Sequence, residues 1–295
     1  MFTRSFCAAR FVLAAFGATL ASGLCGQSPS TEHIPQGWYV YPNSKLKHAD
    51  ESTLRCFNFS HNEWYVSLER DDVKITKRSE RKSDTPLLPP QLKLQPGMPG
   101  RTVNAGLSDS MHFASGWLLA YDAGEFGGGL WLTNEDGSET RLILSDNVRG
   151  LVPLEGGGVL VLSGLAHMSM DFGNEFIFSK PEGMNIPLQY AAHLDGAPRA
   201  FTKLADGSVL FVTTQSMNAI TTKPRKSAEL NYFPKWMRML YPNSILALND
   251  GTIFIGMRML VLRLTPSTAG YNEGWLLPNS CRKFETRETD CVCKP

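Results

Sequence analysis

The 295-residue sequence has little net charge and no long apolar segment after its N-terminus. The formal net charge is +1 and charged residues make up 19% of the chain, so no electrostatic argument favours binding to nucleic acid or anionic lipid. No later segment reaches the roughly 18 uninterrupted apolar residues that indicate a membrane helix. The composition therefore argues against a nucleic-acid-binding protein and against a transmembrane helix.

Catalytic signature motifs are missing as well. The sequence contains no Asp-x-Asp-x-Asp-Gly calcium loop, no His-Glu-x-x-His zinc helix, no Gly-x-Ser-x-Gly nucleophile elbow and no Walker glycine loop. It also lacks the helical apolar period that marks repeats built from helices. Nothing in the motifs supports catalysis, and a binding protein built from strands becomes the first hypothesis.

The N-terminus has the organisation of a secretory signal peptide. Arg4 and Arg10 precede an apolar run over residues 11–20, and small and then polar residues follow. The apolar run is too short to span a bilayer. We therefore predict a signal peptide over residues 1–26 and a mature protein that is periplasmic or secreted.

Cys25 offers a second interpretation of the same segment, a lipid anchor. A bacterial lipobox requires a small residue immediately before the lipidated cysteine, and this position holds Leu24. The sequence therefore favours a free N-terminus over a lipid-modified one.

Four cysteines remain after the predicted signal peptide, and an even number of cysteines in an exported chain indicates disulfides. They are Cys56, Cys281, Cys291 and Cys293. Cys291 and Cys293 are too close in sequence to pair comfortably with each other. We therefore predict that Cys281 pairs with one of them and Cys56 with the other, which would join the two ends of the fold. A metal site at the Cys-x-Cys motif is the alternative, but an oxidising compartment consumes thiols.

A strand–turn–strand unit repeats along the chain. Two apolar runs flank Asp250-Gly251, and the same order recurs around Asp206-Gly207 and around the glycines at 156–158. Glycine at such turns indicates β-hairpins, because tight hairpin turns need positive φ angles. The second strand of successive units is predicted to begin near Trp64, Trp117, Val159, Val209 and Ile253. Spacings of 42 to 53 residues between these positions are typical of propeller blades.

The repeat predicts an all-β fold, a single β-propeller of about five four-stranded blades. We place the propeller at residues 51–280, after an extended N-terminal segment at 27–50 and before a cysteine-containing tail at 281–295. Residues 37–46 would raise the number of blades to six if they formed an additional set of strands. A pair of β-sandwiches is the alternative, since short strands with turn signals suit that fold too.

Residues 248–266, LNDGTIFIGMRMLVLRLTP, carry a resemblance to a known repeat. The segment is similar to the repeats of bacterial sensor-type propellers, the two-component-regulator-like family. The matching positions are Asp250, Gly251, Ile255, Gly256, Arg263 and Leu264, while Phe254 stands where the repeat usually has tryptophan. The resemblance implies a propeller and leaves the function open, because propellers host many unrelated activities.

Loops between the second and third strands of a blade gather on one face of a propeller, where ligands usually bind. Here these loops contain six polar residues: Asp122, Glu125, His167, Asp171, Asn174 and Glu175. Their oxygen atoms suit a bound calcium ion, and the histidine among them suits general acid–base chemistry. The alternative is a set of solvated loops in which aspartate and asparagine cap turns.

Methionines occur two residues apart at three places, and His167 adjoins one of these places. The six methionines are Met168, Met170, Met237, Met239, Met257 and Met259. Residues two apart share one face of a strand, and thioether ligands with a histidine suit Cu(I). Methionine also fills irregular gaps between packed sheets, which is the alternative. The intervening Arg238 and Arg258 are expected to form salt bridges, or else to bind an anion.

These features favour an exported, non-catalytic binding protein that presents its loop face to a protein partner, as an inhibitor, an immunity factor or an envelope-assembly component. One alternative is a propeller hydrolase or lyase that acts on a sugar or lactone through His167, Asp171 and Glu175. The other is periplasmic copper handling by the methionines. We predict no cofactor, apart from the calcium or copper ion considered above.

Overall fold

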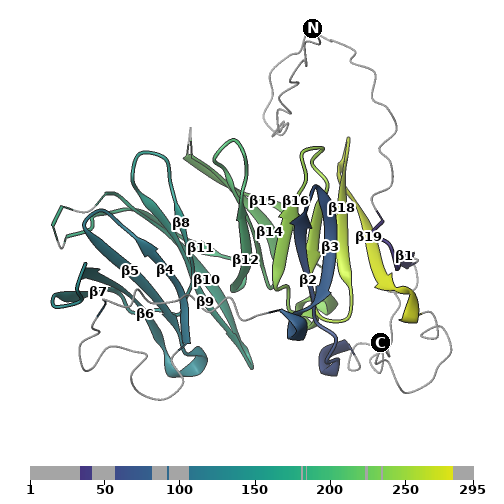
Figure 1. Cartoon of the computed structure of the whole chain (residues 1–295), viewed down its shortest axis with the longest axis horizontal. Coiled ribbons are helices and arrows are strands. Elements are labelled where there is room, and N and C mark those ends of the chain that lie inside the picture. The colour runs from purple at the N-terminus through teal and green to yellow at the C-terminus, as the bar shows by residue number, and fades with distance from the viewer. Residues whose placement is uncertain are drawn as a thin grey trace, which may run out of the picture.

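The structure, a computed structural model, describes residues 34–41, 57–81, 92, 106–180, 182–183, 185–222, 225–233 and 235–281. The predicted signal peptide lies outside these residues, as do Cys56, Cys291 and Cys293. The described chain is nearly all-β, with several four-stranded antiparallel sheets, consistent with a propeller (Figure 1). No helix in this part of the chain is long and apolar enough to cross a membrane.

Three sheets are four-stranded antiparallel meanders that follow one another along the chain. The first contains β4 (Gly106–His112), β5 (Gly116–Asp122), β6 (Gly128–Asn134) and β7 (Thr140–Leu144). The second contains β8 (Val148–Pro153), β9 (Val159–His167), β10 (Met170–Phe178) and β11 (Leu188–Leu194). The third contains β12 (Pro198–Lys203), β13 (Val209–Thr213), β14 (Ser216–Thr222) and β15 (Arg225–Tyr232). The second strand of each sheet begins at or next to the predicted residue, which confirms the repeat in these three units.

The last sheet has five strands because a segment from the N-terminal part of the chain joins it. It contains β16 (Ser244–Ala247), β17 (Ile253–Gly256), β18 (Val261–Ser267) and β19 (Gly270–Pro278), and β1 (Trp38–Tyr41) pairs antiparallel with β19 at the outer edge. The described part of residues 37–46 therefore joins the last sheet and does not begin a sixth blade, and residues 42–46 lie outside the described residues. The described part of this segment extends the last blade, because the free edge of β19 offers unpaired backbone groups to a further strand.

The hairpin of β2 (Trp64–Glu69) and β3 (Asp72–Lys77) forms a separate two-stranded sheet. β2 contacts β16 and β17 in the way that β8 contacts β4 and β5, so it occupies the position of an innermost blade strand. We predicted instead that Trp64 would begin a second strand. Residues 57–62 contain no strand, because their backbone turns to meet the last blade. There the Trp64 N–H donates to Met257 O at 3.0 Å and the Met259 N–H donates to Asn62 O at 2.7 Å.

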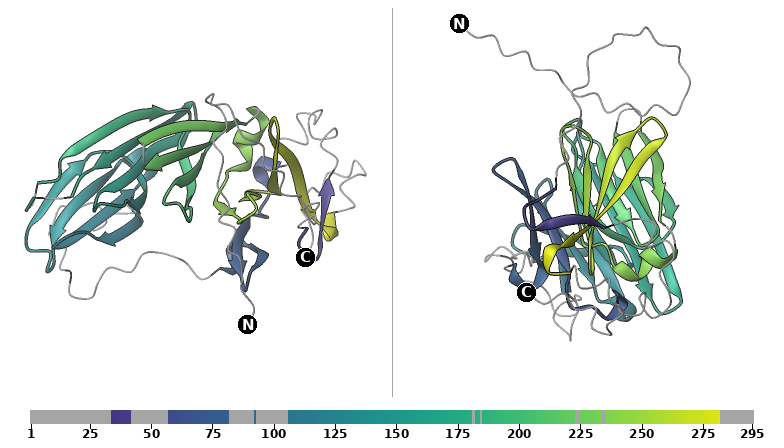
Figure 2. Two further views of the ribbon diagram at one scale, coloured as in Figure 1. Left: turned by 90° about the horizontal axis from the view of Figure 1, so that it is seen from above. Right: turned by 90° about the vertical axis from the view of Figure 1, so that its right-hand side faces the viewer.

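The inner strands contact one another in the order β4, β8, β12, β16, β2. Figure 2 shows the sheets following an arc, with β4–β7 at one end and the β2–β3 hairpin beside the last sheet. Within the described residues, four sheets and one hairpin thus stand where five four-stranded blades were predicted. Cys281, the cysteine that the described residues include, is 3% exposed and disulfide-bonded. Its pairing, and ring closure through Cys56, stay predictions.

Neighbouring sheets pack face to face, which explains the continuous apolar run at residues 159–162 of β9. Val159 and Val161 pack against the β4–β7 sheet, whereas Leu160 and Leu162 pack with apolar residues of the β12–β15 sheet. All four side chains are fully buried. A strand between two sheets is buried on both faces, so it shows an apolar run and no polar alternation.

Close approach of two inner strands depends on a glycine. A Cβ added at Gly150 in β8 would lie 1.9 Å from Cε1 of Phe201 in β12. The Phe201 ring therefore rests directly on the backbone of the neighbouring blade. Protein interiors are packed densely enough that no spare volume exists here for a methyl group.

Replacing Gly150 with alanine should lower the free energy of unfolding by about 1–3 kcal/mol, because the ring or the backbone must move. The matched control is Gly106→Ala in β4, where the nearest atom to an added Cβ is Asp122 O at 3.7 Å. Urea unfolding measures both variants. An unchanged free energy in Gly150→Ala, or an equal loss in Gly106→Ala, would contradict the close packing.

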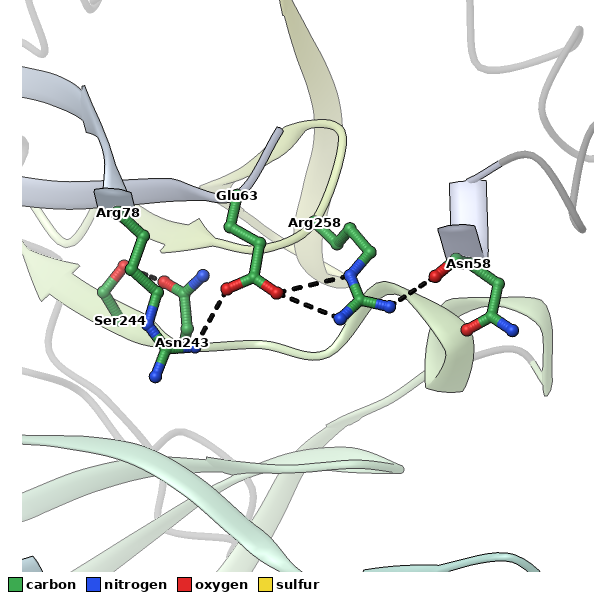
Figure 3. Close-up of polar contacts among 6 residues, drawn as sticks. All are labelled: Asn58, Glu63, Arg78, Asn243, Ser244 and Arg258. Atoms are coloured by element: carbon green, nitrogen blue, oxygen red, sulfur yellow. Dashed lines mark hydrogen bonds and ion pairs between the residues drawn. The ribbon is translucent and has the colours of Figure 1, made fainter. Parts of the chain in front are cut away.

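One ion-pair cluster connects the β2–β3 hairpin to the last blade (Figure 3). Glu63 forms an antiparallel bridge with Arg258, whose Nη2 lies 3.0 Å from Glu63 Oε1. Arg78, the first residue of the 3-10 turn η1 (Arg78–Glu80), binds the other carboxylate oxygen at 2.9 Å. Arg258 also donates to the carbonyl of Asn58. The salt bridge expected for Arg258 is thus confirmed.

Burial alone would raise the pKa of Glu63, but hydrogen bonds and charge from Arg258 and Arg78 outweigh burial and lower it. The carboxylate therefore stabilises the fold above its ordinary pKa of 4.5, and this stabilisation is lost as the pH falls through the lowered folded-state pKa. Glu63→Gln should lower the melting temperature at neutral pH, with a gap to the unaltered protein that closes in acid.

Thermal unfolding between neutral and acidic pH measures this gap. Glu69→Gln is the control, because Glu69 pairs with Lys74 at the exposed end of the hairpin and exposed pairs contribute little. Equal melting temperatures for Glu63→Gln and the unaltered protein at neutral pH would refute the role of this carboxylate.

Candidate functional site

The segment predicted as a loop at residues 163–175 is the end of a long β-hairpin. β9 runs to His167 and β10 begins at Met170, so two residues form the turn. Asn174 and Glu175 therefore lie inside β10, and their placement in a loop is wrong. Polarity predicted a loop here, but Asn174 and Glu175 are polar residues within a strand.

Asp171 connects two blades. Its Oδ1 accepts hydrogen bonds from the Ala197 N–H at 3.0 Å and the Thr214 hydroxyl at 2.6 Å. Its Oδ2 accepts a hydrogen bond from Gln215 Nε2 at 2.9 Å. All three donors lie in or next to the β12–β15 sheet. Asp171 thus holds the tip of β10 against the next blade.

Asn174 and Glu175 have different partners. Asn174 Nδ2 donates to Asp146 Oδ2 at 3.1 Å, and Asn174 Oδ1 lies 2.7 Å from His193 Nδ1. Glu175 is fully buried, where its Oε2 accepts a hydrogen bond from the Ser227 hydroxyl of β15 at 3.2 Å. Tyr190 is a second hydrogen-bond donor to this carboxyl group. Burial raises the pKa of Glu175 despite its hydrogen bonds.

The remaining predicted residues, Asp122, Glu125 and His167, belong to two separate side-chain pairs. Glu125 lies in the 3-10 turn η2 (Gly124–Phe126), and its Oε2 is 2.8 Å from His167 Nε2. Asp122, the last residue of β5, forms an ion pair with Arg149. Among the residues that the structure describes, no group of three or more His, Cys, Asp and Glu side chains could hold a metal ion. The six predicted residues are thus divided among separate contacts.

The described methionines lie in two different environments. Met237 belongs to the 3-10 turn η3 (Lys235–Leu240) and not to a strand, and with Met257 and Met259 it is buried in the core of the last two sheets. Met168 and Met170 are instead exposed at the tip of the β9–β10 hairpin. Gap filling accounts for the buried methionines, whereas the exposed pair belongs to a surface.

Four large apolar side chains are exposed at the tips of two neighbouring hairpins, and we name them the hairpin-tip patch. Phe126 in η2 is 82% exposed and Met168 is 92% exposed. Met170 and Phe172 of β10 are 44% and 43% exposed. The contact between η2 and β9 places the two tips side by side. Apolar side chains that gather on a surface mark binding sites.

A pair of arginines near the starts of the inner strands was missed by the sequence reasoning. Arg149 in β8 and Arg199 in β12 are each the extra residue of a β-bulge. A bulge re-aims the side chain it carries. Each arginine also lies ten residues before the start of the following strand, at Val159 and Val209. The two arginines thus occupy equivalent positions in adjacent repeats, and this spacing could have identified them from the sequence.

Tyr241 lies between two guanidinium groups at the same end of the sheets. Its ring centroid is 5.6 Å from Arg199 Cζ and 4.4 Å from Arg258 Cζ. Aromatic rings attract cations at such distances. Arg238 donates from Nη2 to Gln215 Oε1 at 2.7 Å and so belongs to the same polar region.

No known protein family matches the sequence, and no curated protein matches it. Solved structures that align with the chain include virginiamycin B lyase from Staphylococcus aureus, with 14% identity and a TM-score of 0.37 over 72% of this chain and 69% of that one. A gluconolactonase from Xanthomonas campestris aligns with 15% identity and a TM-score of 0.33 over 55% of this chain and 59% of its own.

The extracellular domain of a protein named as a hybrid two-component system, from B. thetaiotaomicron, aligns with 9% identity and a TM-score of 0.37. That alignment covers 80% of this chain and 42% of the other. At this level of similarity, the argument for a function rests on the described residues alone.

Glu175→Gln should raise stability at neutral pH, because the raised pKa of Glu175 means that the fold favours the protonated side chain. The protonated form stabilises the fold below the ordinary pKa of 4.5, and this contribution is lost as the pH rises through the raised folded-state pKa. Thermal unfolding at several pH values should show a gain for Glu175→Gln that grows with pH. A variant less stable than the unaltered protein at alkaline pH would show that the fold favours ionised Glu175.

Proposed function

We propose that the protein is an exported, non-catalytic binding protein that docks a protein partner on its hairpin-tip patch. The observation that carries this proposal is the exposure of Phe126 and Met168, at 82% and 92%, on adjacent hairpins. Burying a side chain of this size contributes about 1.5–3 kcal/mol. A partner that covers the patch gains this free energy.

The chemistry of the patch suits a protein better than a small molecule. Small ligands bind in concave pockets that enclose most of their surface, whereas the patch lies on hairpin tips. Aromatic residues and methionine are enriched at protein interfaces, and charged residues surround the apolar centre. Here the polar neighbours are Glu125 and His167, which contact each other between the two tips. Export follows from the predicted signal peptide at residues 1–26.

The contacts at the hairpin tips give less support to the two alternatives, a hydrolase or lyase and a copper-handling protein. A hydrolase or lyase would use His167 and Asp171 together. His167 contacts Glu125, however, whereas Asp171 accepts hydrogen bonds from the next blade. Copper handling would use Met168 and Met170 with His167, and the Glu125 carboxylate occupies the Nε2 side of that histidine.

The test is the double variant Phe126→Ser and Met168→Ser, compared with the unaltered mature protein in affinity capture. Immobilised protein is exposed to envelope and secreted proteins of the source organism, and bound proteins are quantified by mass spectrometry. We expect one partner whose recovery falls at least about tenfold in the double variant, since each interface-centre side chain typically contributes more than about 1 kcal/mol.

Leu188→Ser is the matched control, because Leu188 is 53% exposed and lies opposite Phe178, at the far end of the β10–β11 pairing from the tips. It should retain the partner. Equal recovery by the double variant and the control would overturn the proposal, as would a capture in which no protein exceeds the bare matrix.

A further inference from the structure

Arg199 is a cation without an ion pair in the part of the chain that the structure describes, and its one ring contact is with Tyr241. Its Nε is buried and makes no hydrogen bond, and none of the described carboxylates forms an ion pair with it. Burial and the positive charge of Arg149 lower the pKa of Arg199. A buried N–H donor without a hydrogen bond destabilises the folded state. The buried Nε of Arg199 is such a donor, and a ligand would explain why it is kept.

Two carboxylates lie close enough to attract Arg199, but both are engaged elsewhere. Asp122 forms its ion pair with Arg149, and its Oδ1 accepts a hydrogen bond from the Gly124 N–H at 3.0 Å. Asp171 accepts three hydrogen bonds from the neighbouring blade. Neither carboxylate therefore neutralises the guanidinium by direct contact.

The neighbouring cations differ from Arg199 in this respect. Arg149 is paired with Asp122, and Arg258, whose Cζ also lies near the Tyr241 ring, is paired with Glu63. Of these three arginines, Arg199 is the one without a carboxylate in direct contact. Arg199 is half-buried and can still be reached from solvent.

We propose that Arg199, with Arg149 and Tyr241 beside it, binds an oxyanion, namely a carboxylate or phosphate group of a small ligand. A guanidinium presents parallel N–H donors that match two oxygen atoms of such a group. The phenolic hydroxyl of Tyr241 is a further donor. The bulge in β12 aims Arg199 at this site, and the same device in β8 supplies Arg149. This site is independent of the proposed protein partner.

The test compares the unaltered mature protein with Arg199→Met in inorganic phosphate, in acetate and in chloride at equal ionic strength. A ligand that binds only the folded state stabilises it, so phosphate or acetate should raise the melting temperature of the unaltered protein above that in chloride. Arg199→Met should abolish the rise. Calorimetric titration should show at least about tenfold weaker binding of the same anion, the loss expected for a charge-assisted hydrogen bond.

Stability in chloride separates ligand binding from a structural role. Arg199→Met should be at least as stable as the unaltered protein in chloride, because it removes an unpaired donor and the repulsion from Arg149. Arg141→Met is the matched control, since Arg141 is exposed on β7 and donates to Asn185 Oδ1 at 3.5 Å. It should keep the full anion response.

A response to phosphate alone assigns a phosphate-bearing ligand, and a response to acetate assigns a carboxylate. The proposal is overturned if neither oxyanion exceeds chloride, or if Arg199→Met responds like the unaltered protein. It is also overturned if Arg199→Met is markedly less stable in chloride, because the guanidinium would then be a structural group.

Discussion

The joint between the β2–β3 hairpin and the last blade is the constraint on which the rest of the arrangement depends. Glu63 and Arg258 are separated by 195 residues, and their contact closes a loop that contains all the intervening sheets. Closing so long a loop costs entropy, and a single partly buried ion pair would not offset that cost alone. The ion pair is therefore accompanied by backbone bonds from Trp64 and Met259, and by β1 on the edge of β19.

Carboxylates of the described residues serve as connections between blades, and Asp109 and Asp171 are two of them. Asp109 of β4 accepts a hydrogen bond from the Leu151 N–H of β8 at 2.9 Å, and Asp171 of β10 does the same for Ala197 beside β12. Each bond satisfies a backbone donor that would otherwise be buried without a partner. Asp171, which lies close enough to attract Arg199, is held by its donors in the next blade and makes no direct contact with it.

The sequence predicted those features of the fold that depend on local patterns. Strand starts at Val159, Val209 and Ile253 follow from apolar runs and glycine turns within about ten residues of each other, and the structure confirms them. The pairing of β1 and the inner position of β2 depend on free strand edges far away in sequence, so no local pattern marked them. The candidate site was harder to predict, because the direction of Asp171 is decided by donors in the next blade.

The hairpin-tip patch and the arginine site are connected through one side chain. Asp122 pairs with Arg149 and also accepts a hydrogen bond from the N–H of Gly124, the first residue of the turn that carries Phe126. The position of Arg149 therefore acts on the turn that presents the patch. Asp122 thus belongs to both regions, since one of its oxygens holds Arg149 of the inner strand and the other holds the turn.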